Sequence, residues 1–101
     1  MKPQTEVAVE QSLCELTDLL VDRGHDKLTL TARLAEDRVE ITLRYSGAAL
    51  PNPPKFATAQ DLMGEDEERH RFSVWLATRQ AQGFRQRVVD GENEAWLAFE
   101  D

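Results

Sequence analysis

The sequence predicts an α+β two-layer sandwich, in which two main helices pack on one face of a mainly antiparallel four-stranded sheet. Two segments carry apolar residues at helical spacing, and four others alternate apolar and polar residues as half-buried strands do. The segments follow one another as helix, strand, strand, long loop, helix, strand, strand. Strands joined by short turns pair antiparallel, so this order predicts the two-layer arrangement.

The first helix is predicted from Thr5 to Arg23. Its apolar residues recur at spacings of four, three and four, which places them on one face: Val9, Leu13, Leu16 and Leu20. Thr5 can cap the start of this helix, and Gly24 can end it.

The next two elements are strands. Apolar and polar residues alternate over residues 28–34 and again over residues 39–45, which predicts two half-buried strands joined as a hairpin through Ala35-Glu36-Asp37. Residues 46–66 then form a long, lid-like loop rich in glycine and proline, with room for a short helical turn at Thr58 to Met63.

The second helix is predicted to follow the acidic run Glu65 to Glu68 and to continue to about Gln82, before Gly83. Negative charge suits the partial positive charge of a helix N-terminus. Four residues of this helix are available to the core: Phe72, Trp75, Leu76 and Ala81.

The last two strands are predicted at residues 84–89 and 94–100, with the turn at Asp90 to Asn93. Trp96 is opposite in phase to Leu97 and Phe99, which face the core. We therefore expect Trp96 on the other face of the sheet, where an exposed aromatic side chain is a candidate interaction residue.

Length and composition predict one domain, residues 1–101, in a chain with 41% hydrophobic and 31% charged residues. A net charge of −7 would repel a phosphate backbone, so nucleic acid is not an expected partner. No apolar run approaches the roughly 20 residues that span a bilayer, and we expect a cytoplasmic chain with no membrane span of its own. Both a full-length protein and a domain of a longer one are compatible with these totals.

Few residues suggest a metal or a nucleophile. Cys14 is the single cysteine and is expected to be a small packed residue, while His25 and His70 have no partner at metal-ligand spacing and are expected at the solvated surface. The acidic run lacks the glycine and the spacing of a calcium loop. No base can be identified for the serines, Ser12 and Ser73. We expect no metal and no cofactor.

Three stretches carry a family resemblance. ELTDLLVDRG runs from Glu15 to Gly24, RYSGAAL covers residues 44–50, and SVWLATRQAQGF precedes the closing stretch GENEAWLAFE. Their order and spacing resemble the first-helix box, the Asp-x-Gly-x-Gly turn and the later helix and closing strand of the GHKL or Bergerat-fold ATPases. This family includes histidine kinases, anti-sigma serine kinases and gyrase B. The resemblance extends from about Val9 to Phe99.

The resemblance implies that most of the family's chemistry is lost here. Glu15 matches the family's general base, but Leu19 stands where an asparagine binds magnesium, and Tyr45 replaces the aspartate that recognises adenine. Gly47 matches a turn glycine, whereas Ser73 or a neighbour replaces the glycine that admits the phosphates. Each missing binding partner for ATP costs about 1–3 kcal/mol of binding free energy. Together the losses offset most of the roughly 8 kcal/mol that a micromolar site provides. Glu15 is then a vestigial base, and ATP is not expected to bind.

A narrower resemblance concerns residues 70–101, which are similar to the soluble C-terminal extensions of some bacterial xanthine/uracil permeases. It implies a place on the cytoplasmic side of a nucleobase transporter, tethered to the inner membrane. The second half of the chain is also locally basic and could dock an acidic partner surface or anionic lipid headgroups. Its basic residues are Arg69, His70, Arg71, Arg79, Arg85 and Arg87.

Three functions remain open. The favoured one is a non-catalytic regulatory or interaction domain with a degenerate histidine-kinase-like ATPase fold, appended to or partnering a membrane transporter and acting through its surface, with the loop at residues 46–66 as one candidate. The second is an anti-sigma-type serine/histidine kinase with weak ATP binding and Glu15 as base; Leu19 and Tyr45 speak against it. The third is a nucleobase sensor in which Tyr45 stacks on the ligand and Glu15 hydrogen-bonds it.

Overall fold

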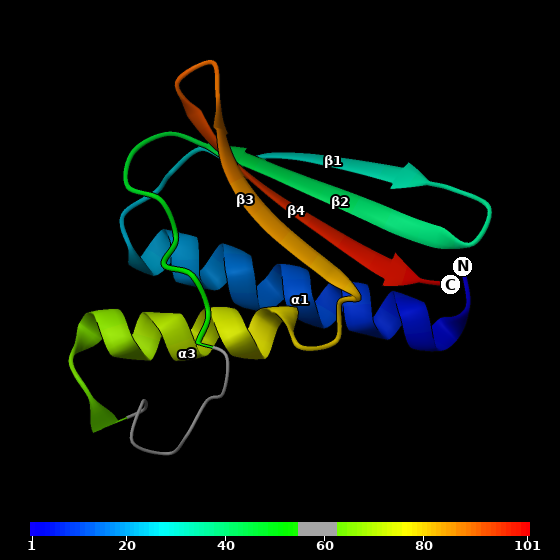
Figure 1. Ribbon diagram of the computed structural model, residues 1–101, viewed down its shortest axis with the longest axis horizontal. Coiled ribbons are helices and arrows are strands. Elements are labelled where there is room, and N and C mark those ends of the chain that lie inside the picture. Colours follow the sequence, from blue (N-terminus) through cyan, green and yellow to red (C-terminus); the bar gives the residue numbers. More distant parts are fainter. Residues whose placement is uncertain (55–62) are drawn as a thin grey trace.

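The computed structural model describes residues 1–54 and 63–101 and confirms the predicted fold class. Two helices lie on one face of an antiparallel sheet whose strand order is β1-β2-β4-β3 (Figure 1). The elements are α1 (Pro3–Asp22), β1 (Thr29–Leu34), β2 (Arg38–Tyr45), α3 (Asp66–Thr78), β3 (Gly83–Val89) and β4 (Glu92–Glu100). The helical turn predicted at Thr58 to Met63 lies, except for Met63, outside the described residues.

Helix α1 begins two residues before the predicted start. Pro3 occupies its first turn, where the missing N–H costs nothing, and Lys2 precedes it without a side-chain cap. The prediction that Thr5 caps the helix is wrong: Thr5 is buried, and its Oγ1 donates a hydrogen bond to the Glu100 carbonyl oxygen at 3.2 Å. The first helix is thereby tied to the end of the sheet.

Helix α1 ends just before Gly24, as the sequence predicted. Gly24 has φ +91°, and its N–H donates to the carbonyl oxygen of Val21, while the N–H of His25 donates to that of Leu20, both at 3.0 Å. This pair of bonds is the Schellman motif, which needs a residue in the left-handed region after the helix.

The hydrophobic core lies between the sheet and the two helices. The predicted alternation of core-facing and outward-facing residues in β2 and β4 is confirmed. Every second residue of β2 and the predicted inner residues of β4 are buried. The largest fully buried side chains come from α1, α3, β2 and β4: Leu16, Leu20, Val39, Leu43, Tyr45, Val74, Leu97 and Phe99.

Strand β1 departs from its prediction. It was expected to be half buried, yet all six of its residues are exposed. Leu30 and Leu34 pair with the buried residues Leu43 and Val39, so they point to the helix side of the sheet. They stay exposed because β1 is an edge strand and neither helix extends beneath it (Figure 1).

Helix α3 is shorter than predicted. It starts with the acidic first turn as expected, but it ends at Thr78, and its buried residues are Val74, Ala77 and Thr78. Phe72, Trp75 and Leu76 are half-buried. The chain leaves the helix early because the N–H of Gln82 already donates to the carbonyl oxygen of Ala98 in the sheet, at 2.8 Å.

The last hairpin turns on two residues. Asp90 and Gly91 have φ of +51° and +80°, and Val89 pairs with Glu92. Positive φ at both central residues characterises the tight turn favoured by Asp-Gly sequences. The predicted four-residue turn is wrong, and β4 begins at Glu92.

Candidate functional site

The residues implied by the family resemblance lie at two separate places. The first is a shallow groove of about 200 Å³ between α1 and α3, which run side by side (Figure 1). Three of the implied residues meet there with three others: Glu15, Leu19 and Ser73, with Asp18, Asp22 and Leu76. Leu19 is buried, and Ser73 Oγ donates a hydrogen bond to the Arg69 carbonyl oxygen at 3.1 Å, so neither offers a free donor.

The chemistry of this groove does not suit a nucleotide. Among the described residues, its charged lining groups are the carboxylates of Glu15, Asp18 and Asp22, which repel a phosphate. Among residues 1–54 and 63–101 no group of three or more His, Cys, Asp or Glu side chains is placed to hold a metal ion. Beside Glu15 the groove holds Leu19, an apolar side chain, at the position where the resemblance implies a metal-binding asparagine.

Tyr45 lies at the end of β2, in the core. Its side chain is 1% exposed, its hydroxyl accepts a hydrogen bond from the N–H of Leu50 at 2.9 Å, and the ring of His25 meets it edge-on at 5.1 Å between centroids. Burial raises the pKa of the Tyr45 phenol, although the Leu50 bond and the charge of Arg23 act in the opposite direction. With both ring faces packed, Tyr45 offers no surface on which a nucleobase could stack.

Gly47 lies in a turn after β2 and not in a ligand-binding loop. Its φ is +91°, a conformation that favours glycine, and its carbonyl oxygen accepts a hydrogen bond from Asn93 Nδ2 at 2.8 Å. A Cβ at this position would lie 3.4 Å from Cε1 of His25. Gly47 therefore joins the exit of β2 to the start of β4, away from the groove that holds Glu15.

Arg23 is a central residue that the sequence did not single out. Its Nη1 donates to Glu67 Oε2 at 3.2 Å and lies 2.7 Å from His70 Nδ1, while its Nη2 donates to the Ala49 carbonyl oxygen at 3.2 Å. These contacts join the end of α1, the start of α3 and the loop after β2. Because no spacing rule links residues so far apart, only the tertiary structure reveals this junction.

Three expectations about single residues are wrong. Cys14 is exposed, because it lies on the side of α1 opposite to the buried Leu16 and Leu20. His25 packs against Tyr45, and His70 contacts Arg23, so both histidines are half-buried. Neither histidine is the solvated surface residue that was expected.

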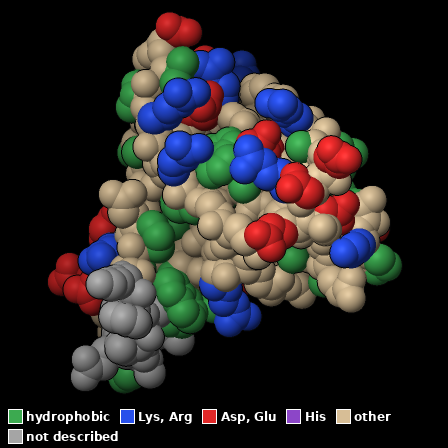
Figure 2. Space-filling view, turned by 45° about the vertical axis from the view of Figure 1, so that its right-hand side comes forward, with side chains coloured by type: hydrophobic (Ala, Val, Ile, Leu, Met, Phe, Trp, Pro, Cys, Tyr) green, Lys and Arg blue, Asp and Glu red, His purple; other side chains and the backbone are tan. Residues whose placement is uncertain are grey.

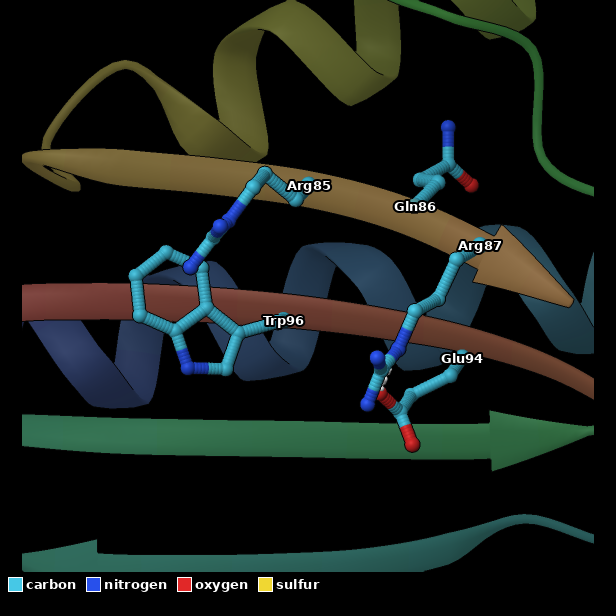
Figure 3. A pocket seen from close by; sticks show the side chains of 5 residues that line it. All are labelled: Arg85, Gln86, Arg87, Glu94 and Trp96. Carbon is cyan, nitrogen blue, oxygen red and sulfur yellow. Dashed lines mark hydrogen bonds and ion pairs between the residues drawn. The ribbon is translucent and has the colours of Figure 1, made fainter. Parts of the chain in front are cut away.

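The outer face of the sheet carries a hollow of about 390 Å³ at the β3–β4 hairpin (Figure 3). Trp96 lies there, as its phase predicted. The guanidinium carbon of Arg85 is 4.3 Å from the centroid of the indole ring. Gly83 leaves room for that ring, because a Cβ on it would come within 2.9 Å of Trp96 Cζ3. Arg85 and Gly83 thus hold the indole in place from β3.

Arg85 and Arg87, the two arginines of β3 near Trp96, differ in their ion-pair partners. Arg87 Nε donates to Glu94 Oε1 at 2.7 Å (Figure 3). Arg44 Nε lies 3.8 Å from the other oxygen of Glu94. Arg85 has no carboxylate within ion-pair distance in the described part of the chain. Arg85 is exposed and its guanidinium lies over the indole ring, an arrangement suited to binding a carboxylate.

The outer face carries one more basic than acidic side chain, although the chain as a whole is acidic. The strand register places five arginines and four glutamates on it: Arg33, Arg38, Arg44, Arg85 and Arg87, with Glu40, Glu92, Glu94 and Glu100. Figure 2 shows Lys and Arg side chains over the upper part of the molecule, with Asp and Glu side chains among them and hydrophobic side chains exposed between them. This face therefore combines an excess of positive charge with an aromatic platform.

Comparison of the chain with protein-family models, with curated proteins and with solved structures found no match. In the described residues, no helix has the length and apolar character needed to cross a membrane.

Proposed function

We propose that the chain is a non-catalytic regulatory or interaction domain that binds an acidic protein segment on the outer face of its sheet. The observation that carries the proposal is the Arg85 guanidinium, which is stacked 4.3 Å over Trp96 and has no described carboxylate partner. A stacked guanidinium loses little conformational freedom when it binds a carboxylate, and the indole beside it adds an apolar contact.

The state of the implied ATP site supports the non-catalytic part of the proposal. Leu19 cannot bind a metal, Tyr45 fills the place expected for adenine recognition, and the groove beside Glu15 is acidic. The proposal keeps the context that the resemblance implies: a degenerate histidine-kinase-like ATPase domain on the cytoplasmic side of a nucleobase transporter. An acidic segment of that transporter, or of another protein, is then the partner.

The test is an amide NMR titration of the labelled chain with a glutamate-rich peptide that contains one aromatic residue. The two tryptophans give separate indole signals, so Trp96 reports the outer face and Trp75 the helical layer. We expect saturable shifts at Trp96 and in β3, and weaker binding as salt is added, because the contact is charged and exposed. Trp75 should not shift.

A matched pair of variants locates the site. Arg85→Gln removes the stacked charge and should weaken peptide binding about tenfold, as the loss of one charge-assisted hydrogen bond does. Arg79→Gln removes the same charge from an exposed position after α3 and should leave the affinity unchanged. Equal affinity for the peptide in wild type and Arg85→Gln would contradict the docking surface.

Titrations with magnesium-ATP, with nucleobases and with lipid vesicles separate the alternatives. Saturable shifts around Glu15, Gly47 and Ser73 with magnesium-ATP would overturn the non-catalytic assignment and favour the kinase. Shifts with xanthine or uracil alone would favour a nucleobase sensor. Binding to phosphatidylglycerol vesicles, without binding to the peptide, would assign the basic face to lipid headgroups.

A further inference from the structure

The hollow beside Trp96 carries more positive charge than one carboxylate ligand can neutralise. Among the described residues, Glu94 supplies its one lining carboxylate, and two arginines share it: Arg87 Nε donates to Oε1 at 2.7 Å, and Arg44 Nε lies 3.8 Å from Oε2. Arg85 adds a third positive charge, with no carboxylate at ion-pair distance in the described chain. Three positive charges and one negative charge leave a net charge of +2 at this place.

Arg85 and Arg87 can donate further hydrogen bonds. They are two residues apart on β3 and so point to the same face of the sheet, with Cα atoms roughly 7 Å apart. Figure 3 shows both side chains reaching from β3 toward β4. In the described part of the chain Arg85 makes no hydrogen bond, and Arg87 uses only its Nε, in the bond to Glu94. Both guanidinium groups can therefore donate to one anion that lies between them.

The fold holds part of this charge in place before any ligand arrives. The guanidinium carbon of Arg85 lies 4.3 Å from the centroid of the Trp96 indole. Arg44 is half-buried: its Nη2 donates to the Val89 carbonyl oxygen at 3.2 Å, while its Nε is buried without a hydrogen-bond partner in the described structure. Glu94 therefore compensates the charge of Arg44 only in part. An additional anion in the hollow would meet charges that lose little conformational freedom on binding.

We infer that the acidic segment bound by the outer face carries a phosphorylated side chain, whose phosphoryl group lies in this hollow between Arg85 and Arg87. The inference rests on the proposed function and names the chemistry of its ligand. A phosphorylated side chain has a charge of about −1.5 to −2 and three acceptor oxygens, so one group can neutralise the local excess and accept from both arginines. A carboxylate has one charge and two oxygens, and it leaves one arginine uncompensated. Phosphorylation of the partner would then control its binding.

A single phosphoryl group on a protein segment suits this charge distribution better than a membrane does. The outer face as a whole carries only one more basic than acidic side chain, and the chain has a net charge of −7. A surface of many anionic headgroups would be repelled by this overall charge, whereas one phosphoryl group meets the local charge of +2. The ligand that the hollow favours is therefore a phosphorylated segment of a protein.

The test uses the full chain and three forms of one glutamate-rich peptide, which differ at a central position that holds phosphoserine, phosphotyrosine or two adjacent glutamates. The two-glutamate form has nearly the same charge as the phosphorylated forms, so it controls for charge alone. Isothermal titration calorimetry measures the affinities. We expect a phosphorylated form to bind about tenfold more tightly than the two-glutamate form, because one phosphoryl group accepts from both guanidinium groups.

A matched pair of variants locates the phosphoryl group. Arg87→Gln should reduce the preference for the phosphorylated form to about twofold or less, because the phosphoryl group then has only Arg85 to bind. Arg33→Gln is the control and should leave the preference unchanged. Arg33 lies on the outer face in β1, is 77% exposed against 71% for Arg87, and is likewise paired with a glutamate, Glu40, that is 13% exposed. Circular dichroism checks that both variants stay folded.

The outcomes separate this inference from the proposed function. If the phosphorylated and two-glutamate forms bind equally, the inference is overturned while the acidic docking surface stands. If no form of the peptide binds, both are overturned. A preference for the phosphorylated form that Arg87→Gln leaves intact, or that Arg33→Gln reduces equally, would also overturn the inference, because the phosphoryl group would then not lie in the hollow. Binding to vesicles that contain phosphatidic acid, without binding to the phosphorylated peptides, would overturn it in favour of a lipid phosphate.

Discussion

Tyr45 shows at the scale of one residue how a position implied to recognise a ligand serves the fold instead. Its hydroxyl accepts the N–H of Leu50, so the turn after β2 closes on the end of that strand. Burial raises its pKa, and the unfolded chain therefore loses the phenolic proton at lower pH than the folded chain. The resulting stability is complete below the unfolded pKa of about 10 and is lost as the pH rises through the folded value.

Tyr45→Phe should lower the free energy of unfolding by about 1–3 kcal/mol, because the buried N–H of Leu50 loses its acceptor. Urea unfolding followed by tryptophan fluorescence measures this difference. Tyr45 is the only tyrosine, so the ultraviolet absorbance of phenolate reports it alone. The folded chain should titrate above the ordinary tyrosine range and the urea-unfolded chain within it. Identical titrations in the two states would contradict the buried position.

At the scale of the element, the β3–β4 hairpin decides which side chains form the basic face. The two-residue turn at Asp90-Gly91 places Arg85 opposite Trp96 and Arg87 opposite Glu94. The four-residue turn expected from the sequence would have shifted each pair by two residues. An Asp-Gly pair between alternating strands is the strongest short-range hairpin signal, and reading it as a two-residue turn would have predicted these contacts.

Gly91→Ala tests the hairpin. A Cβ at Gly91 meets no atom within 4 Å, so the cost arises only from its φ of +80°. We expect a loss of about 1–2 kcal/mol, the usual cost of the left-handed conformation for a residue with a Cβ. Gly91→Asn, which tolerates this conformation, is the control and should lose less in the same thermal unfolding experiment. Equal losses would mean that the turn is not held in this conformation.

At the scale of the whole molecule, the layers are joined by a few long-range polar contacts in addition to the core. Arg23 connects both helices and the loop after β2, and its side chain is only 13% exposed, whereas its ion-pair partner Glu67 is 65% exposed. The Nε of Arg23 is buried without a partner in the described structure. The contribution of Arg23 to stability therefore depends on its hydrogen bonds to Ala49 and His70 more than on its ion pair with Glu67.

Arg23→Met should destabilise the chain by about 1–3 kcal/mol, because the Ala49 carbonyl and His70 lose a charged donor. Glu67→Gln, the control, should change stability by at most about 1 kcal/mol, as expected of an exposed ion pair. Amide hydrogen exchange should accelerate after β2 and at the start of α3 in Arg23→Met only. If Glu67→Gln were equally destabilising, the ion pair would be the dominant contact.

The candidate site could be predicted only in part. The alternation of β4 placed Trp96 on the outer face, but no local pattern indicates that Arg85 stacks on it or that Gly83 makes room for it. The groove containing Glu15, Leu19 and Ser73 was implied by a resemblance, whereas the burial of Tyr45 and the junction at Arg23 depend on contacts between segments far apart in the chain. Such contacts leave no periodic trace in the sequence.

The sequence by itself determined the order of the elements, their antiparallel pairing and the end of α1, because periodicity, turn residues and a glycine after a helix act over a few neighbouring residues. Only the tertiary structure decided how far the helices extend beneath the sheet. That extent separates the buried apolar residues of β2 from the exposed leucines of β1, although both strands have the same alternating pattern. Burial depends on what lies opposite a strand, and a strand's own residues do not encode it.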